Sequence, residues 1–205
     1  MFRTLFAGLF LASPVSADFL TFSDIAGHYV VTSARMSSHV AQPLDPDAED
    51  PTGFELVITD AGLEIPGEDC ADWSLTPTEV FLHPRFDPNL ADVFLEPLGY
   101  PTYTVRCGEA HHTLLTYVDA RVLVMTIDND AAMAVIEKPL TDDEIGAVQA
   151  ALVARGFLDA ATGEMDDATH AAMRLHFRAE FDDGEMAIPL RPAYTAAFLR
   201  TLGIE

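Results

Sequence analysis

The stretch Ala132-Met133-Ala134-Val135-Ile136-Glu137-Lys138-Pro139-Leu140-Thr141-Asp142-Asp143-Glu144-Ile145 contains the change of pattern that decides the fold. Before Pro139, apolar and β-branched residues form a short run of the kind found in sheets. After Pro139, Thr141 and Glu144 have the spacing of a capping box, in which each side chain bonds the other residue's backbone N–H. A strand-rich region is therefore expected to end at Pro139, and a helical region to follow directly.

Short β-rich runs separated by turn residues occupy the region from His28 to Glu137. The last three runs are close enough in sequence to form a meander of hairpins. Because an antiparallel sheet with one apolar face has to close or pair to bury that face, the pattern predicts a small barrel or sandwich. The seven expected strands cover residues 28–32, 54–58, 80–82, 103–106, 113–117, 122–127 and 132–136.

Three helices are expected after Pro139. The first begins at the capping box and ends at Gly156-Phe157, a glycine followed by an apolar residue. The second starts near Asp166, whose carboxylate can cap it, and the third runs from around Pro192 to Gly203. The predicted fold class is therefore α+β: an N-terminal antiparallel β-barrel or sandwich, followed by a C-terminal three-helix bundle.

The N-terminus has the pattern of a secretory signal peptide. Arg3 precedes the apolar run Leu5–Ala12, and the small-residue ending Val15-Ser16-Ala17 resembles a cleavage site. The run is too short for a transmembrane helix, which needs about 20 apolar residues. We expect residues 1–17 to be removed, leaving a β-rich domain (18–139) and a helical domain (140–205) in the periplasm, with no membrane insertion after cleavage.

Cys70 and Cys107 are the two cysteines of the chain. In an oxidising compartment they are expected to form one disulfide. A redox role is disfavoured because their spacing is not that of a C-x-x-C motif. The disulfide is therefore predicted to be structural.

Composition excludes one class of partner. The chain has 33 Asp and Glu against 11 Lys and Arg, a formal net charge of −22. Binding to nucleic acid without sequence preference relies on basic side chains that neutralise phosphates, so it is not expected here.

Catalytic motifs are absent from the sequence. It has no G-x-S-x-G nucleophile elbow and no glycine-rich phosphate loop. A metal site built from His111 or His112 with Asp119 or His83 stays open as an alternative, although adjacent residues on a strand point to opposite faces. We therefore expect a protein that is not an enzyme and that has no cofactor and no metal.

The last third of the chain resembles the peptidoglycan-binding-like domain family, a compact three-helix bundle found in envelope proteins. The matching positions are Val148, Gln149, Leu152, Gly156, Phe157 and Asp159 in the first helix and its turn, and Ala168, Thr169, Ala172 and Phe177 in the second. Arg178 stands where the family usually has Gln. The resemblance implies binding of peptidoglycan in a groove formed by Gln149, Phe157, Asp159, Thr169 and Arg178.

A shorter resemblance lies at the start of the first expected strand. Gly27-His28-Tyr29 is similar to the Gly-x-aromatic opening of lipocalin-like small barrels, whose interiors bind apolar molecules. The expected function is thus that of a non-catalytic, exported cell-envelope protein that binds peptidoglycan through its C-terminal bundle. The alternatives are a periplasmic carrier that holds a small ligand inside the barrel, and a metal-dependent envelope hydrolase.

Overall fold

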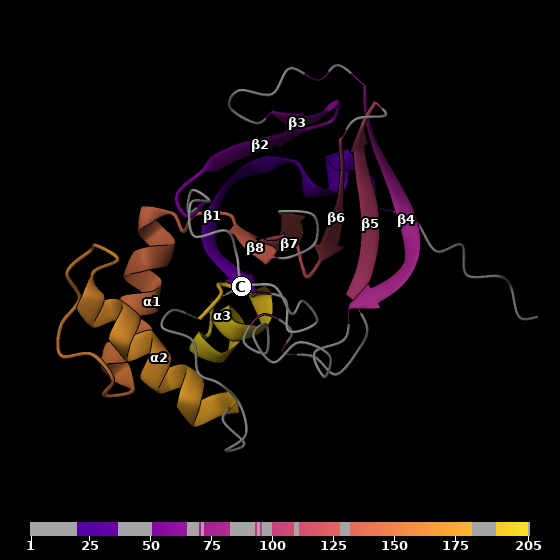
Figure 1. Ribbon diagram of the computed structural model, residues 1–205. Helices are drawn as coiled ribbons and strands as arrows, with labels where there is room; N and C mark the ends of the chain where they lie inside the picture. Colours follow the sequence, from indigo (N-terminus) through magenta and orange to yellow (C-terminus); the bar gives the residue numbers. More distant parts are fainter. Residues whose placement is uncertain are drawn as a thin grey trace, which may run out of the picture.

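The β region forms an eight-stranded, antiparallel, nearly closed barrel, and three helices follow it (Figure 1). The computed structural model describes residues 20–36, 51–64, 70, 72–82, 93, 95, 100–108, 111–127, 132–181 and 192–204. The strands are β1 (Gly27–Met36), β2 (Glu55–Thr59), β3 (Gly62–Glu64), β4 (Trp73–Leu82), β5 (Tyr100–Cys107), β6 (His111–Tyr117), β7 (Val122–Ile127) and β8 (Ala132–Glu137).

The barrel is a meander in which the first and last strands pair. The strand order is β3-β2-β1-β8-β7-β6-β5-β4, so β8 returns to pair with β1 and the remaining seam lies between β3 and β4. Trp73 packs over Gly62 at this seam, where a side chain at position 62 would collide with the indole. Gly62 therefore allows the two ends of the sheet to approach each other.

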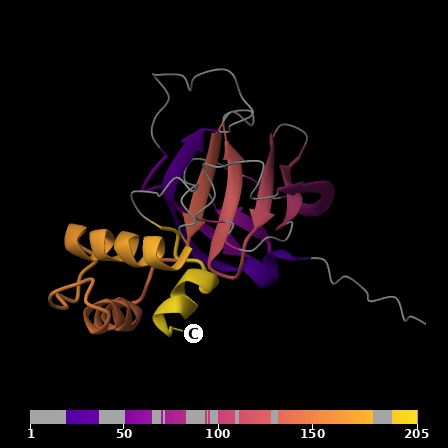
Figure 2. The same ribbon diagram turned by 90° about the horizontal axis from the view of Figure 1, so that it is seen from below.

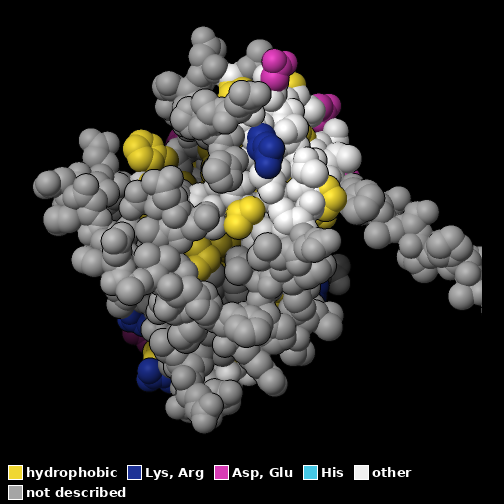
Figure 3. Space-filling model, turned by 45° about the vertical axis from the view of Figure 1, so that its right-hand side comes forward, with side chains coloured by type: hydrophobic (Ala, Val, Ile, Leu, Met, Phe, Trp, Pro, Cys, Tyr) yellow, Lys and Arg dark blue, Asp and Glu magenta, His cyan; other side chains and the backbone are white. Residues whose placement is uncertain are grey.

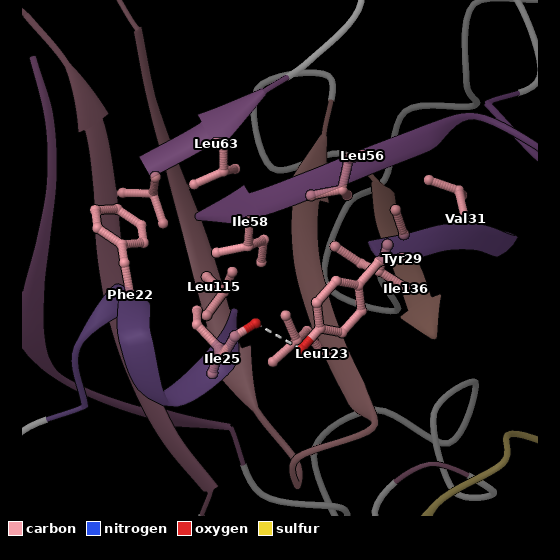
Figure 4. Packing of buried hydrophobic residues seen from close by; sticks show 12 residues of the cluster. Phe22, Ile25, Tyr29, Val31, Leu56, Ile58, Leu63, Leu115, Leu123 and Ile136 are labelled. Atoms are coloured by element: carbon pink, nitrogen blue, oxygen red, sulfur yellow. Dashed lines mark hydrogen bonds between the residues drawn. The ribbon is translucent and has the colours of Figure 1, made fainter. Parts of the chain in front are cut away.

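Successive side chains of a strand point to opposite faces of the sheet, so every second residue of these strands points into the barrel, and most of these residues are apolar. Leu123 of β7 and Ile136 of β8 belong to the interior core, whereas their neighbours Val122 and Val135 belong to a second cluster on the outer face. Figure 4 shows interior side chains from strands far apart in the sequence meeting around the barrel axis. The buried interior residues are Phe22, Ile25, Tyr29, Val31, Leu56, Ile58, Leu63, Val105, Leu115, Leu123, Ala134 and Ile136.

A short 3-10 helix, η1 (Phe22–Ile25), packs into the barrel before β1. The hydroxyl of Tyr29 donates to the carbonyl of Ile25 at 2.8 Å, which ties η1 to β1 (Figure 4). Nearby, the Lys138 ammonium donates to the carbonyl of Ala26 and lies 5.2 Å from the centre of the Tyr29 ring. The Gly-x-aromatic opening thus has a structural role, because Tyr29 fills the interior beneath Lys138.

The helices are α1 (Asp142–Ala154), α2 (Asp167–Phe181) and α3 (Ala196–Leu202), and they lie together on one side of the barrel (Figures 1 and 2). The capping box is confirmed: Thr141 Oγ1 accepts from Glu144 N, and Glu144 Oε2 accepts from Thr141 N at 2.8 Å. Gly156 ends α1 with φ 76°, and Phe157 N donates back to the carbonyl of Leu152. Asp166 caps α2 by accepting from Thr169 N at 2.8 Å.

The predicted fold class is confirmed, but some boundaries differ. The strand β3 was missed because it has only three residues, and β4 begins at Trp73, seven residues before the predicted strand. The third helix begins at Ala196 because Thr195 caps it by accepting from Phe198 N. Pro192 and the two residues after it belong instead to a buried segment that precedes the helix.

The disulfide between Cys70 and Cys107 is present and joins the segment before β4 to the end of β5. The predicted signal peptide lies outside the described residues. Among the described helices, none has the length and apolar character needed to cross a bilayer. On the face brought forward in Figure 3, hydrophobic side chains reach the surface at several separate points of the described part.

Candidate functional site: a pocket between the barrel and helix α3

An apolar patch on the outer face of β7 and β8 is covered by segments from elsewhere in the chain. Val122, Val124, Met133 and Val135 form a buried cluster with Tyr100 of β5, Val93, and Ala193 from the segment before α3. Leu95, which lies between β4 and β5 in the sequence, packs against the core of the helices. The predicted boundary at residue 140 is therefore crossed by packing in both directions.

The turn between β6 and β7 holds the beginning of α3 through Asp119. Oδ1 of Asp119 accepts from the backbone N–H groups of Arg121 and Val122 at 2.8 and 3.0 Å. Oδ2 accepts from Ala196 N at 2.7 Å. One carboxylate thus shapes the barrel turn and anchors the first turn of α3 to it.

The same turn holds the beginning of α1 through Arg121. Its guanidinium bonds both carboxylate oxygens of Glu144, at 2.6 and 3.4 Å. Burial alone would raise the pKa of Glu144, but the Thr141 N–H and the Arg121 guanidinium outweigh burial and lower the pKa.

A third contact between the barrel and the helical region is made by Glu137, a buried carboxylate on the outer face of β8. Its Oε1 accepts from Tyr194 N at 3.3 Å.

A pocket of about 130 Å³ lies beside these contacts, between the barrel and α3. Its volume is close to that of an engineered apolar cavity of about 150 Å³ that takes up benzene. The apolar part of its lining is Val93, Leu95, Tyr100, Val118, Ala196 and Ala197. The polar part is Asp119, Thr195 and Arg200.

The lining combines apolar walls with two side chains of opposite charge. The pocket offers apolar walls, one carboxylate and one guanidinium, but no histidine, cysteine or serine lines it. Within the described ranges, no group of three His, Cys, Asp or Glu residues is placed to hold a metal ion. The lining therefore provides shape and two opposite charges for a small molecule.

Gln149, the first residue of the groove implied by the peptidoglycan-binding resemblance, is fully buried in the helical core. Its amide organises the connection between α1 and α2. Nε2 lies 2.7–3.1 Å from Thr162 Oγ1, Glu164 O and Thr169 Oγ1, and Oε1 accepts from Thr162 N and Gly163 N. In this arrangement both ends of the Gln149 amide are engaged within the protein.

The other four residues of the implied groove do not share one surface. Thr169 is buried and bonded to Gln149 at 2.8 Å. Arg178 is exposed and follows Thr169 by nine residues (178 − 169), about two and a half turns, which places it on the opposite face of α2. Phe157 is half-buried beside His176, with ring centres 5.6 Å apart, and Asp159 is exposed.

The barrel carries three buried or half-buried tyrosines, Tyr29, Tyr103 and Tyr117. Burial raises the pKa of Tyr29, and the neighbouring Tyr117 and Asp119 raise it further. Burial is also the main cause that raises the pKa of Tyr117. The Tyr103 hydroxyl accepts from Leu20 N at 3.4 Å. In the described part of the barrel, these side chains belong to packing and to the attachment of η1.

The structure separates two parts of the alternative metal site. His111 and His112 begin β6, whereas Asp119 lies beyond its other end, and a strand of this length spans about 20 Å. Both oxygens of Asp119 accept backbone hydrogen bonds. His83 lies outside the described residues, as do the side chains of His111 and His112.

Sequence reasoning missed the pocket. Asp119 was considered only as a metal ligand, and Arg200 and Tyr100 were not considered. Asp119 lies between the expected strands 113–117 and 122–127, and nothing in this local pattern points to Ala196 at the start of α3, 77 residues away. A pocket whose walls come from distant segments has no local signature.

The fold and the pocket together describe a small meander barrel whose outer face carries a helical unit, with a pocket at their junction. Comparison with protein-family models, with curated proteins and with solved structures finds no match.

Proposed function

We propose that this protein is a non-catalytic, exported binding protein of the cell envelope that takes up a small ligand between its barrel and α3. The observation that carries this proposal is the pocket of about 130 Å³, to which the barrel and α3 both contribute walls. Pockets at the junction of two structural units are frequent ligand sites. This proposal is closest to the carrier that the sequence offered as an alternative to peptidoglycan binding, but it places the ligand at the outer junction and not in the barrel interior.

Export to the periplasm is part of this proposal. It is supported by the leader pattern of residues 1–17 and by the Cys70–Cys107 disulfide, which suits an oxidising compartment. Mass spectrometry of the protein isolated from periplasmic extract is the test. Loss of residues 1–17 is expected, and a full-length chain in the cytoplasm would contradict export.

Filling the pocket tests the binding site. Ala197 is half-buried and lines the pocket, so Ala197→Leu should occupy part of its volume. Ala147→Leu is the matched control, because Ala147 is exposed on α1. With fluorobenzene as the probe and ¹⁹F NMR as the readout, we expect binding by the wild type and the control and at least a tenfold loss in Ala197→Leu. Equal binding by all three proteins would exclude the pocket as the site.

A second candidate function is peptidoglycan binding by the helices. The observation that favours it is that the matched residues Val148, Leu152, Gly156 and Phe157 form the core and the helix end of a three-helix unit. The test is co-sedimentation of the protein with insoluble sacculi. Retention that falls in Asp159→Ala or Arg178→Ala, but not in the barrel variant His28→Ala, would support this function. Absence of sedimentation by the wild type would refute it.

A further inference from the structure

The proposed function leaves the chemistry of the ligand open, and the two charged residues of the pocket bear on it. Asp119 is half-buried and comes from the barrel turn, whereas Arg200 is exposed and comes from α3. Ala196, Ala197 and Arg200 share one face of α3, because residues one turn apart lie above one another. The pocket therefore has a carboxylate on the barrel wall and a guanidinium on the helix wall.

The apolar lining requires an apolar body on the ligand. Val118 and Tyr100 contribute from the barrel, and Ala196 and Ala197 leave space on the helix side because their side chains are small. A volume of about 130 Å³ holds a branched aliphatic group or a single ring. The pocket is too small to enclose a long lipid chain.

The charges select among small apolar molecules. The chain has a net charge of −22, so its overall field repels a simple anion and attracts a cation. Asp119 can accept from an ammonium group through its remaining lone pairs, since a carboxylate has about four acceptor positions and three are used by backbone N–H groups. Arg200 can donate to a carboxylate, for which the planar guanidinium is well suited.

We infer that the ligand is a small zwitterion with an apolar side group, such as a free aliphatic amino acid. Its ammonium would face Asp119, its carboxylate would face Arg200, and its side group would fill the apolar part of the pocket. A zwitterion has no net charge, so the acidic field of the protein does not oppose its entry. This inference rests on the proposed small-ligand function and narrows it to one chemical class.

Three probes of matched shape test the class in the intact protein. L-Leucine carries both charges, 4-methylpentanoate lacks the ammonium, and 3-methylbutylamine lacks the carboxylate. We expect L-leucine to displace fluorobenzene in ¹⁹F NMR at concentrations at least tenfold lower than either single-charge analogue. Arg200→Gln should abolish the preference for L-leucine over the amine, and Arg106→Gln, at an exposed arginine on β5, should leave it unchanged.

The outcomes separate this inference from the proposed function. If fluorobenzene binds but L-leucine displaces it no better than its analogues, the pocket is supported as a binding site and a zwitterionic ligand is excluded. If neither fluorobenzene nor L-leucine binds, both the proposed function and this inference are overturned. Asp119→Asn, with its fold checked by circular dichroism, is the second variant, and it should abolish the preference for L-leucine over 4-methylpentanoate. An unchanged preference in both variants would refute the inference.

Discussion

At the residue scale, His176 is a buried titratable group at the centre of the helical core. Its Nε2 lies 2.8 Å from Thr201 Oγ1, and its ring packs between Phe157 and Phe198. Its Nδ1 is buried and has no hydrogen-bond partner among the described residues. Burial lowers the pKa of His176; Glu180 opposes this effect and Arg155 adds to it.

The lowered pKa of His176 predicts an acid-sensitive helical core. Because the unfolded chain binds the proton near pH 6.5 and the folded protein binds it only at lower pH, the free energy of unfolding should fall as the pH drops below about 6.5. His176→Leu should reduce this loss between pH 7 and 5, as measured by urea denaturation at each pH. His28→Leu, which removes an exposed histidine, is the control. The same pH dependence in His176→Leu and in the wild type would contradict the prediction.

Gln149 is the second residue whose burial leads to a prediction. Gln149→Leu keeps a side chain of similar size but leaves Thr162 N and Gly163 N without their acceptor. Because Thr162 and Gly163 are exposed, each lost hydrogen bond costs about 0.5–1.5 kcal/mol, so we expect a loss of about 1–3 kcal/mol in the free energy of unfolding. Asp159→Asn, at an exposed position nearby, should change it by less than about 0.5 kcal/mol. Equal stability of the two variants would show that the amide does not hold the loop.

At the scale of elements, the β6–β7 turn links three parts of the fold. Asp119 anchors α3, and Arg121 pairs with Glu144 at the start of α1. These contacts join backbone and side-chain groups that lie far apart in the sequence. The helices are therefore held to the barrel by hydrogen bonds and an ion pair as well as by apolar packing.

Asp119→Ala should loosen α3 without disrupting the barrel interior. The change removes the acceptor for the N–H groups of Ala196, Arg121 and Val122. Amide hydrogen exchange should become at least tenfold faster at Ala196 and unchanged at Leu123, which lies in the barrel core. Asp142→Ala, at an exposed residue in the first turn of α1, serves as the control. Exchange at Ala196 as slow as in the wild type would refute the anchoring role.

At the scale of the whole molecule, the disulfide closes a loop that contains β4 and most of β5. Cys70 and Cys107 are 37 residues apart, and the chain-entropy model gives a stabilisation of about 4 kcal/mol for such a loop. The double variant Cys70→Ser/Cys107→Ser should lose roughly that free energy of unfolding in urea, and a reducing agent should have no further effect on it. A loss below about 1 kcal/mol would mean that the unfolded state is constrained by other means.

The prediction of helix α1 from sequence succeeded because its signals are local. Thr141, Glu144 and Gly156 act on backbone groups within a few residues, so their spacing alone specifies where α1 begins and ends. The strand β3 has no such signal, because three residues are too few for a periodic pattern. Its position depends on pairing with β2 and on the contact of Gly62 with Trp73.

The candidate site was much less predictable than the fold. Gln149 and Thr169 were assigned to a ligand groove, yet both are buried in the structure and bonded to each other. The roles of Asp119 and Arg200 depend on two segments that meet only in the folded protein. A polar residue in a sequence pattern does not reveal whether its partner is a ligand or the protein's own backbone.

The sequence by itself determined the α+β class, the succession of a strand-rich region and three helices, and the limits of α1, because alternation, capping and turn chemistry act over a few residues. Tertiary structure alone decided that the sheet closes with β8 against β1, that Asp119 anchors α3, and that a pocket forms between the barrel and α3. These features arise from burial of apolar faces and pairing of polar groups across the whole chain. Such interactions depend on distances in space, which spacing along the sequence does not specify.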